Sequence, residues 1–349
     1  MSGSASIYSL AGVAVAGVSM AAATLARRER TYLPRGHASR LDTCRDPLRR
    51  ALRYGCAGLT VGVEVAADGR LRLATGAPGA SAASAQVPAA PAGARSVGGE
   101  VADGAVAPGT TATGATATAT RPTATATRPT ATATRPTATR ATADAAPGDP
   151  GRTLARLVLE PLLARVRARG RVHPAQHQPF SVVLEPAGGA SAAHLLDLLE
   201  EELTGYSEML TRSRAGTVRH SAVLVALAGA PRGALSRRES RLFFAEGTLA
   251  DVDTGVATSV VPLVGEHVAW RFGWDGRGEI PAEERHVLRA LVAAARAEGK
   301  RVRLFGVPEK RRAVRRAYWR ELHAAGVDLI GARDVATLRR FLRAQRAHR

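Results

Sequence analysis

The stretch YGCAGLTVGVEV, residues 54–65, has the composition of a β-strand that is buried on both faces. Small and apolar residues fill nearly every position, and strands of this kind are typical of parallel sheets that are covered by helices. Side chains alternate along a strand, so Thr60, Gly62 and Glu64 share one face. The stretch therefore predicts a central strand of an α/β fold, with a carboxylate only at its far end.

Similar apolar runs recur through the rest of the chain and alternate with segments of helical periodicity. The segment 281–299, for example, opens with Pro281 and two glutamates and closes on Gly299, which are good start and stop signals for a helix. About eight strands are predicted in all. They lie near 32–36, 58–65, 180–185, 221–229, 241–247, 259–265, 302–308 and 327–331, with further helices over 153–170, 192–210, 315–326 and 334–345.

This alternation predicts a (β/α)₈ TIM barrel, in which functional groups lie at the carboxyl ends of the strands. A doubly wound open sheet is the alternative. That fold usually carries a glycine-rich nucleotide-binding loop, and the segment GAPRGAL at 229–235 fits neither phosphate-binding pattern. The barrel is therefore the favoured architecture.

An uncharged segment precedes the predicted barrel. Residues 7–25 carry no charge, and about 20 apolar residues are enough for a helix to span a bilayer. Arg27, Arg28 and Arg30 follow directly, so the positive-inside rule would keep the body of the chain in the cytosol. We predict a single-pass membrane anchor in residues 1–30. A cleaved signal peptide is the alternative, because small residues end the apolar run, but no basic segment precedes it.

Residues 76–150 differ in composition from the rest of the chain. They contain no Leu, Ile, Met, Phe, Tyr or Trp, and TATATRP occurs three times over 116–136. Such a segment cannot bury enough apolar surface to offset the entropy cost of ordering it. We predict a disordered Ala/Thr/Pro-rich insertion that divides the barrel into residues 31–75 and 151–345.

The charge of the chain is strongly positive and uneven. The formal net charge is +19, and residues 300–349 contain 15 Lys and Arg against four Asp and Glu. Such a surface favours anionic partners, and we predict a membrane or an anionic lipid; the alternative is an ordinary solvated Arg-rich face. Nucleic acid is not predicted, because stacking aromatics and zinc-ligand spacings are missing. The two cysteines, Cys44 and Cys56, are too few for a disulfide framework.

Four blocks of the sequence together resemble a known family in order and spacing. They are HASRLDTCRDPLRRALRYGCAGLTVGVEV (37–65), GRTLARLVLEPLLARV (151–166), FGWDGRGEIPAEERHVLRALVAAARAEGKRVRLFGVPE (272–309) and YWRELHAAGVDLIGARDVATLRRFL (318–342). The chain resembles the altered-inheritance-of-mitochondria protein 6 family of fungi, within the phosphatidylinositol phospholipase C and glycerophosphodiester phosphodiesterase-like superfamily. The resemblance implies a TIM barrel of the phospholipase C-like type, a phosphoric diester hydrolase activity in lipid metabolism, bound Mg²⁺ or Ca²⁺, and association with mitochondria.

The resemblance also places the family's catalytic motifs on this sequence. In the H-S-H-N-D-Y block of the family, His37 stands at the first histidine and Ser39 at the second, which is the histidine expected to move protons. Thr60 and Gly62 stand where the family's G-x-E-A-D-V block supplies two metal-binding carboxylates. Thr75 stands near the place of the second catalytic histidine. Most of the catalytic groups that the resemblance implies are therefore replaced.

One acidic position of the family is kept, because Glu185 ends the segment that contains VVLEPA. Phosphodiester cleavage needs an acid, a base and a divalent cation, which is usually held by several carboxylate oxygens. We therefore expect a catalytically impaired protein that binds anionic lipid or phosphodiester ligands and holds no metal tightly. The alternative is an active hydrolase whose Mg²⁺ or Ca²⁺ is bound by relocated ligands, namely Glu64, Glu185, His37 and Asp42. A third hypothesis is a scaffold whose working part is the segment 76–150.

Overall fold

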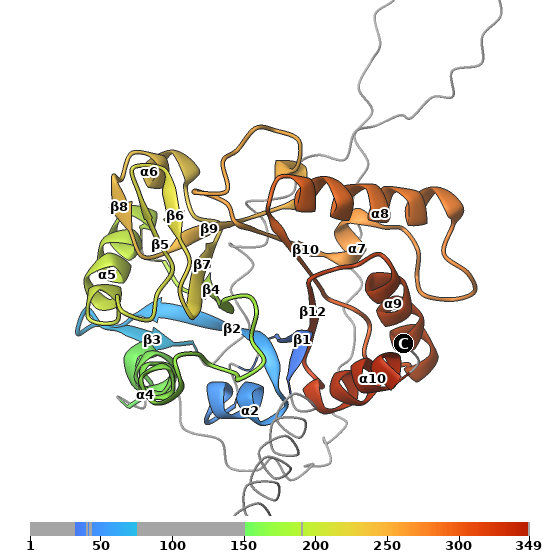
Figure 1. Ribbon diagram of the computed structural model, residues 1–349, viewed down its shortest axis with the longest axis horizontal. Coiled ribbons are helices and arrows are strands. Elements are labelled where there is room, and N and C mark those ends of the chain that lie inside the picture. The colour runs from blue at the N-terminus through green and yellow to red at the C-terminus, as the bar shows by residue number, and fades with distance from the viewer. Residues whose placement is uncertain (1–31, 40, 42–43, 75–150, 190, 348–349) are drawn as a thin grey trace, which may run out of the picture. The chain divides into compact units, whose positions relative to one another are not determined.

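The computed structural model describes residues 32–39, 41, 44–74, 151–189 and 191–347. Within these residues eight parallel strands form a barrel: β1 (Leu33–Ala38), β2 (Cys56–Val65), β4 (Phe180–Pro186), β7 (Val223–Ala228), β9 (Phe244–Gly247), β10 (Leu263–His267), β11 (Arg301–Phe305) and β12 (Leu329–Ala332). The barrel is closed, because β1 pairs with β2 on one side and with β12 on the other (Figure 1). The predicted barrel is thereby confirmed and the open sheet is excluded.

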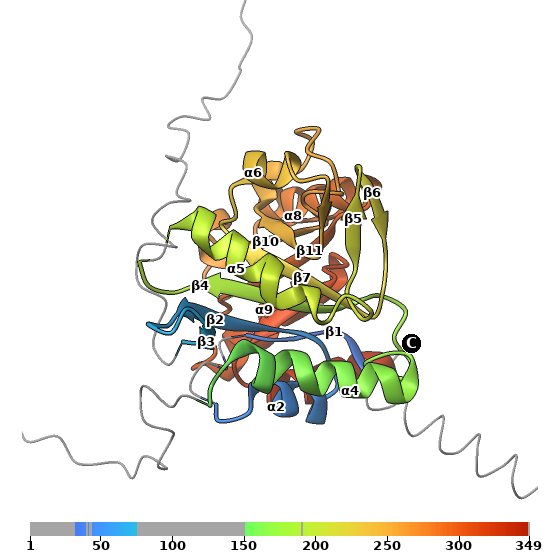
Figure 2. The ribbon, with the colours of Figure 1, turned by 90° about the vertical axis from the view of Figure 1, so that its left-hand side faces the viewer.

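Helices cover the outside of the barrel (Figures 1 and 2). The longer ones are α4 (Glu160–Arg169), entered through the π-helical turn η1 (Ala155–Leu159), α5 (Ala192–Thr204), α8 (Ala282–Ala297), α9 (Arg312–Ala324) and α10 (Val335–Ala347). Shorter ones are α2 (Pro47–Arg53), α6 (Arg232–Ser236) and α7 (Val268–Arg271). In both figures α2 and α4 lie together outside β2, and α2 packs on that strand.

Glycines decide where two of the long helices end. α8 follows Pro281 and stops just before Gly299, which has a φ of 74°, so the prediction for this helix is confirmed. The helix expected over 192–210 is wrong at its end, because α5 stops at Thr204 and Gly205 caps it. Glycine disfavours a helix interior through its conformational freedom, and it commonly terminates one.

A small second sheet interrupts the predicted alternation. It consists of three antiparallel strands, β5 (Arg212–Arg214), β6 (Thr217–Arg219) and β8 (Ser240–Arg241). The strand expected over 241–247 is therefore two elements, since Arg241 belongs to β8 and β9 begins at Phe244. The strand expected over 259–265 begins later than predicted, at Leu263, because Pro262 has no N–H to offer a ladder.

The described part of the chain has an outer core and a smaller inner one. Tyr318, Trp319 and Leu322 of α9 are buried in the outer core, as their helical spacing predicts. The inner cluster draws on β2, β4, β7, β9, β10 and β12 and includes Val183 and Phe244. This cluster fills the barrel interior. The polar side chains of the strands lie between it and the carboxyl ends of the strands.

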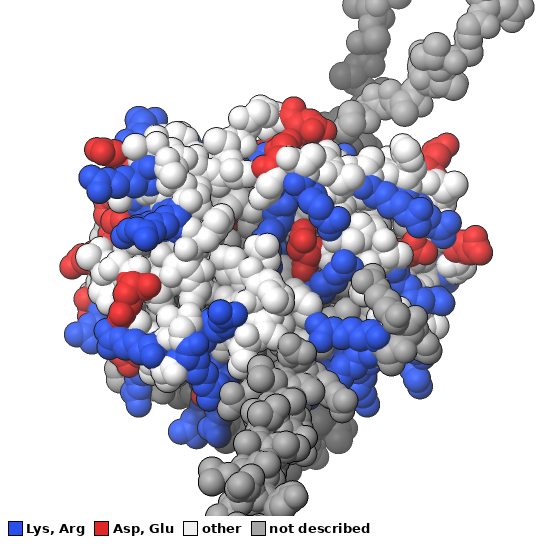
Figure 3. Space-filling model, in the orientation of Figure 1, with Lys and Arg blue, Asp and Glu red and all other residues white. Residues whose placement is uncertain are grey.

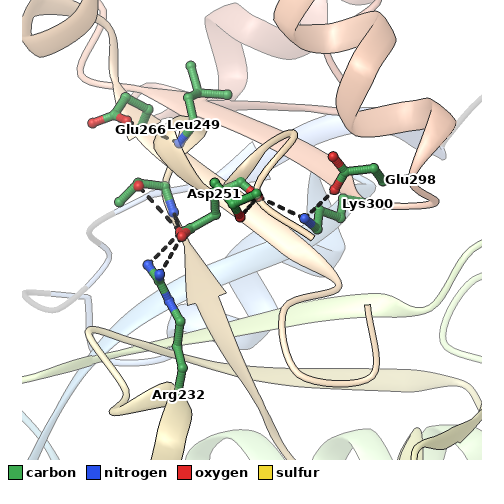
Figure 4. Close-up of polar contacts among 8 residues, drawn as sticks. Arg232, Leu249, Asp251, Glu266, Glu298 and Lys300 are labelled. Carbon is green, nitrogen blue, oxygen red and sulfur yellow. Dashed lines mark hydrogen bonds and ion pairs between the residues drawn. The ribbon is translucent and has the colours of Figure 1, made fainter. Parts of the chain in front are cut away.

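The connection from β9 to β10 carries the 3₁₀ turn η2 (Leu249–Asp251) in place of a longer helix (Figure 4). Asp251 is buried and forms an ion pair with Arg232. Its backbone carbonyl accepts a hydrogen bond of 2.8 Å from Nζ of Lys300, which also pairs with Glu298. These contacts fix the loop that leaves the carboxyl end of β9.

Several predictions fall on residues outside the described part of the chain. They are the membrane anchor in 1–30, the insertion 76–150 and the positions Asp42 and Thr75. Among the described residues, no helix is long and apolar enough to cross a bilayer. Both cysteines are free thiols, as their number predicts.

Candidate functional site

The carboxyl ends of the barrel strands open into a cleft of about 1360 Å³. This is the end of the barrel at which TIM-barrel proteins carry their functional groups. The cleft is large enough for an organic ligand, since such pockets commonly measure about 300–1,000 Å³. Its polar and aromatic lining includes Ser39, Glu185, Glu246, Glu266, His267, Trp270, Arg303, Phe305, Lys310, Arg311 and Arg333.

A buried ion pair lies at the floor of this cleft. Arg303 of β11 donates from Nε to Oε1 of Glu246 at 2.6 Å and from Nη2 to Oε2 of the same carboxylate at 2.8 Å. Arg303 is 1% exposed and Glu246 is 6% exposed, so both charges are removed from water. Bidentate pairs of this kind are among the strongest hydrogen-bonded ion pairs that arginine makes. Gly265 is needed beside the pair, because a Cβ there would lie 2.2 Å from Oε1 of Glu246.

The same guanidinium reaches two further groups. Its Nη1 donates to the hydroxyl of Thr60 at 3.0 Å, and its Nη2 lies 3.9 Å from Oε1 of Glu185. The two carboxylates and the hydroxyl thus converge on one side chain. Arg303 therefore supplies the positive charge at the point where acids from β4 and β9 meet.

His37 lies beneath the cleft and is completely buried. Its Nε2 is 2.8 Å from the Thr60 hydroxyl, which already accepts a hydrogen bond from Arg303. The Nδ1 atom of His37 has no hydrogen-bond partner among the described residues. Burial holds the pKa of His37 well below its usual range, and the positive charges of Arg303 and Arg301 lower it further. His37 is a neutral ring that positions Thr60.

The other predicted site residues divide into two groups. Ser39 and Glu185 line the cleft, and the Ser39 side chain is 6% exposed with no hydrogen-bond partner for its hydroxyl among the described residues. Glu64 is half-buried on β2, opposite Arg72 of the antiparallel strand β3 (Leu71–Leu73), and is not among the residues that line the cleft. The structure thus brings Ser39 and Glu185 to the mouth but does not bring Glu64 or His37 there.

The carboxylates at the mouth do not fit the divalent cation that the family resemblance implies. Both oxygens of Glu246 are bonded to Arg303, and Glu185 faces the same guanidinium. Thr60 and Gly62 bring no carboxylate to β2. In the ranges that the structure describes, no three His, Cys, Asp or Glu side chains are grouped so as to hold a metal ion.

Three aromatic rings in contact, those of Phe305, His267 and Trp270, lie along one wall of the cleft, and we call them the aromatic column. The guanidinium of Arg303 lies 4.2 Å from the ring centre of Phe305, whose edge meets His267 at a centroid distance of 5.7 Å. His267 stacks on Trp270 at 5.0 Å with an interplanar angle of 25°. The column therefore links the buried ion pair to an indole that is 53% exposed.

Glu266 is the next-to-last residue of β10, beside this column, and lines the cleft. One carboxylate oxygen accepts a hydrogen bond of 3.2 Å from the backbone N–H of Leu249, as Figure 4 shows. Burial raises the pKa of Glu266, and the nearby charges of Asp251 and Glu246 act in the same direction. The surroundings of Glu266 thus disfavour its ionisation.

Three basic residues lie on the loops that follow β11 and β12, the seventh and eighth strands of the barrel. They are Lys310, Arg311 and Arg333, and none makes an ion pair with another described residue. Loops at these two places commonly bind phosphate in TIM barrels. Basic side chains also predominate over acidic ones on the face shown in Figure 3.

Comparisons of the chain with protein-family models, with curated proteins and with solved structures find no match. The family resemblance therefore stays a prediction, and the function has to be argued from the cleft itself.

Sequence reasoning missed the groups that dominate this cleft, above all Arg303, Glu246 and Trp270. One signal for Arg303 was present, because Arg301 and Arg303 alternate with apolar residues on a strand that is otherwise buried. In a parallel barrel such an alternation indicates that basic side chains point into the interior.

Proposed function

We propose that this chain is a noncatalytic member of the phospholipase C-like phosphodiesterase superfamily that binds the phosphate group of an anionic lipid or phosphodiester at the barrel mouth. The observation that carries the proposal is the trio of basic residues without ion pairs, Lys310, Arg311 and Arg333, at the edge of a large cleft. We call this trio the basic rim.

Five acidic and five basic side chains line the cleft, so it is the position of the unpaired basic residues that supports an anionic ligand. Glu246 is neutralised by Arg303, and Asp275 forms an ion pair of 3.3 Å with Arg277. Glu309 accepts hydrogen bonds from the backbone N–H groups at the start of the loop that leads into α10. The three charges of the basic rim are not paired with an acid, and the unpartnered hydroxyl of Ser39 adds a donor in the same cleft.

The placement of His37 favours binding over catalysis. General acid and base groups must come within hydrogen-bond reach of the reacting atoms. His37 is buried beneath the mouth with its pKa lowered, and Ser39 has no titrating group. The resemblance places a histidine at both positions and expects the second one to move protons. The residues present here therefore support a role in holding a ligand.

A membrane location fits this role. The predicted anchor in residues 1–30 would tether the barrel beside the cytosolic surface of a bilayer, where anionic headgroups attract basic residues by about 1 kcal/mol each. We propose this arrangement for the full chain. The family resemblance implies that the membrane is a mitochondrial one.

The test is a binding assay on the full-length protein in detergent, with glycerol 3-phosphate and glycerophosphoglycerol as soluble probes. Replacing the basic rim by alanines should weaken binding roughly 100-fold, since three contacts of about 1 kcal/mol each are lost. Co-sedimentation with phosphatidylserine vesicles, compared with phosphatidylcholine vesicles, should show the same loss.

The matched control removes three exposed arginines elsewhere. Arg212, Arg214 and Arg219 lie on β5 and β6 and do not line the cleft, so their replacement by alanine should leave binding of the soluble probes unchanged. Equal weakening by both triple variants would refute a specific site. Hydrolysis of glycerophosphoglycerol with Mg²⁺ or Ca²⁺ that disappears in Glu185→Ala would instead support the active hydrolase.

A further inference from the structure

Trp270 is the most exposed large hydrophobic side chain among the described residues. It is 53% exposed, and Val287 of α8, at 40%, is the only other described residue of this kind. The two remaining tryptophans, Trp274 and Trp319, are buried. A single exposed apolar side chain needs no special explanation, but Trp270 differs from Val287 because it lines the cleft.

The orientation of Trp270 is fixed from below. His267 caps the four-residue helix α7, where its Nδ1 accepts a hydrogen bond of 3.2 Å from the N–H of Ala269, and its ring stacks under the indole. Phe305 supports His267 edge-on, and Phe305 in turn lies against Arg303. An indole that is held in place before binding loses little freedom when a ligand arrives.

The backbone next to the column is adapted to the His267 ring. A Cβ at Gly306 would lie 2.0 Å from Nε2 of His267, and Gly306 has a φ of 79°, which favours glycine. The same loop continues to Lys310 and Arg311. One short loop thus makes room for the aromatic column at its start and carries two of the basic-rim residues at its end.

We infer that the ligand of this cleft is a phosphate ester whose organic part is a ring, which stacks on the exposed indole of Trp270 while the basic rim holds the phosphate. The phosphate half of this inference rests on the proposed function, and the ring half rests on Trp270. The cleft of about 1360 Å³ has room for both parts. Glu185, Glu266 and Asp275 line it too and offer acceptors for hydroxyl or amino groups on the ring.

The inference is tested by calorimetry on the full-length protein with phosphate esters that differ in their organic part. Adenosine 5′-monophosphate supplies an aromatic ring, glucose 6-phosphate a sugar ring, and glycerol 3-phosphate no ring. At least one ring-bearing ester should bind roughly tenfold to hundredfold more tightly than glycerol 3-phosphate, which is the range found for stacking on an aromatic side chain. The relative affinities of the first two probes identify the kind of ring.

Substitution of Trp270 should remove this advantage and nothing else. Trp270→Ala should lower the affinity for the ring-bearing ester to that for glycerol 3-phosphate, while Trp270→Phe should keep part of it. Val287→Ala is the matched control and should change neither affinity. Ligand binding should also quench tryptophan fluorescence in the parent protein but not in Trp270→Phe, because the other two tryptophans are buried.

The outcomes separate this inference from the proposed function. Equal affinities for all three esters, or no effect of Trp270→Ala, would overturn the stacking role, whereas the proposed function stands if the basic-rim variant still weakens every ester. If adenosine or glucose binds in a manner that depends on Trp270 and adding a phosphate brings no gain, the stacking surface is supported and the phosphate-binding function fails.

Discussion

Replacing Arg303 by methionine tests the electrostatics of the cleft most directly. Methionine keeps much of the length and apolar volume of arginine but removes its charge and its donors. The variant leaves Glu246, which is 6% exposed, without the guanidinium that bonds both of its oxygens. It also removes the donor to the Thr60 hydroxyl.

The size of the effect follows from burial. Removing one partner of a buried ion pair costs about 3–5 kcal/mol, because an uncompensated charge stays in the interior. That is a large part of the total of about 5–15 kcal/mol that stabilises a typical domain. Replacing both partners by apolar residues is often neutral or stabilising, so Arg303→Met combined with Glu246→Leu should be more stable than Arg303→Met alone.

The assay is urea unfolding at pH 7, followed by circular dichroism, for the parent, both single variants and the double variant. The resulting double-mutant cycle should give a coupling energy of several kcal/mol. Arg167→Ala is the control, because its ion pair with Glu208 is exposed on both sides and should contribute about 0–1 kcal/mol. A loss below about 1 kcal/mol for Arg303→Met, or a double variant no more stable than the single one, would refute the buried pair. Glu246 would then be available to a bound cation.

Three further predictions concern stability. Burial lowers the pKa of His173 to about 4, whereas the pKa of a histidine in the unfolded chain is about 6.5. As the pH falls, the unfolded chain binds this proton first, so the free energy of unfolding should fall by about 2 kcal/mol from pH 8 to pH 5. Thermal melts of His173→Gln should lack this fall. Burial raises the pKa of Glu202 to about 7 against about 4.5 unfolded, so stability is lost as pH rises through this window. Glu202→Gln should therefore gain about 1–2 kcal/mol at pH 8 and little at pH 4, and equal gains at both would contradict the assignment. Arg219 lies directly opposite Arg212 on β5, so Arg219→Glu should stabilise the protein by about 0.2–1 kcal/mol more than Arg219→Ala in urea unfolding, a difference that 1 M salt should erase.

The barrel could be predicted from sequence because its strands are buried on both faces. Apolar runs such as residues 221–229 have no polar alternation, which indicates a parallel sheet between helices. Closure is a different matter, since it depends on the pairing of β1 with β12, which are nearly 300 residues apart in a chain of 349 residues. Closure of the sheet was predicted only from the number of strands. The sheet of β5, β6 and β8 was missed because its strands are two or three residues long, and because β5 and β6 carry exposed arginines.

The candidate site was less accessible to sequence reasoning. The replacement of acids by Thr60 and Gly62 is visible in the sequence, but what fills their place is not. The pair of Arg303 with Glu246 joins residues 57 positions apart on strands that are not adjacent in the barrel. In a chain with 49 Lys and Arg, one more arginine is most simply interpreted as part of a solvated face. Only the three-dimensional register shows that this one is 1% exposed.

Arg303 also helps to explain how the cleft could hold an anion although five acids line it. Its guanidinium is fixed among Glu246, Glu185 and Thr60, so the negative potential that would attract a cation is partly cancelled at its source. Because arginine stays charged at all physiological pH values, this cancellation does not depend on pH as a bound metal or a histidine would. The basic rim adds three positive charges at the mouth that have no acid partner among the described residues. The same arginine supports Phe305 and, through it, the His267–Trp270 stack, so one buried side chain both pairs with acids of the cleft and supports the surface on which the ring of a ligand would stack.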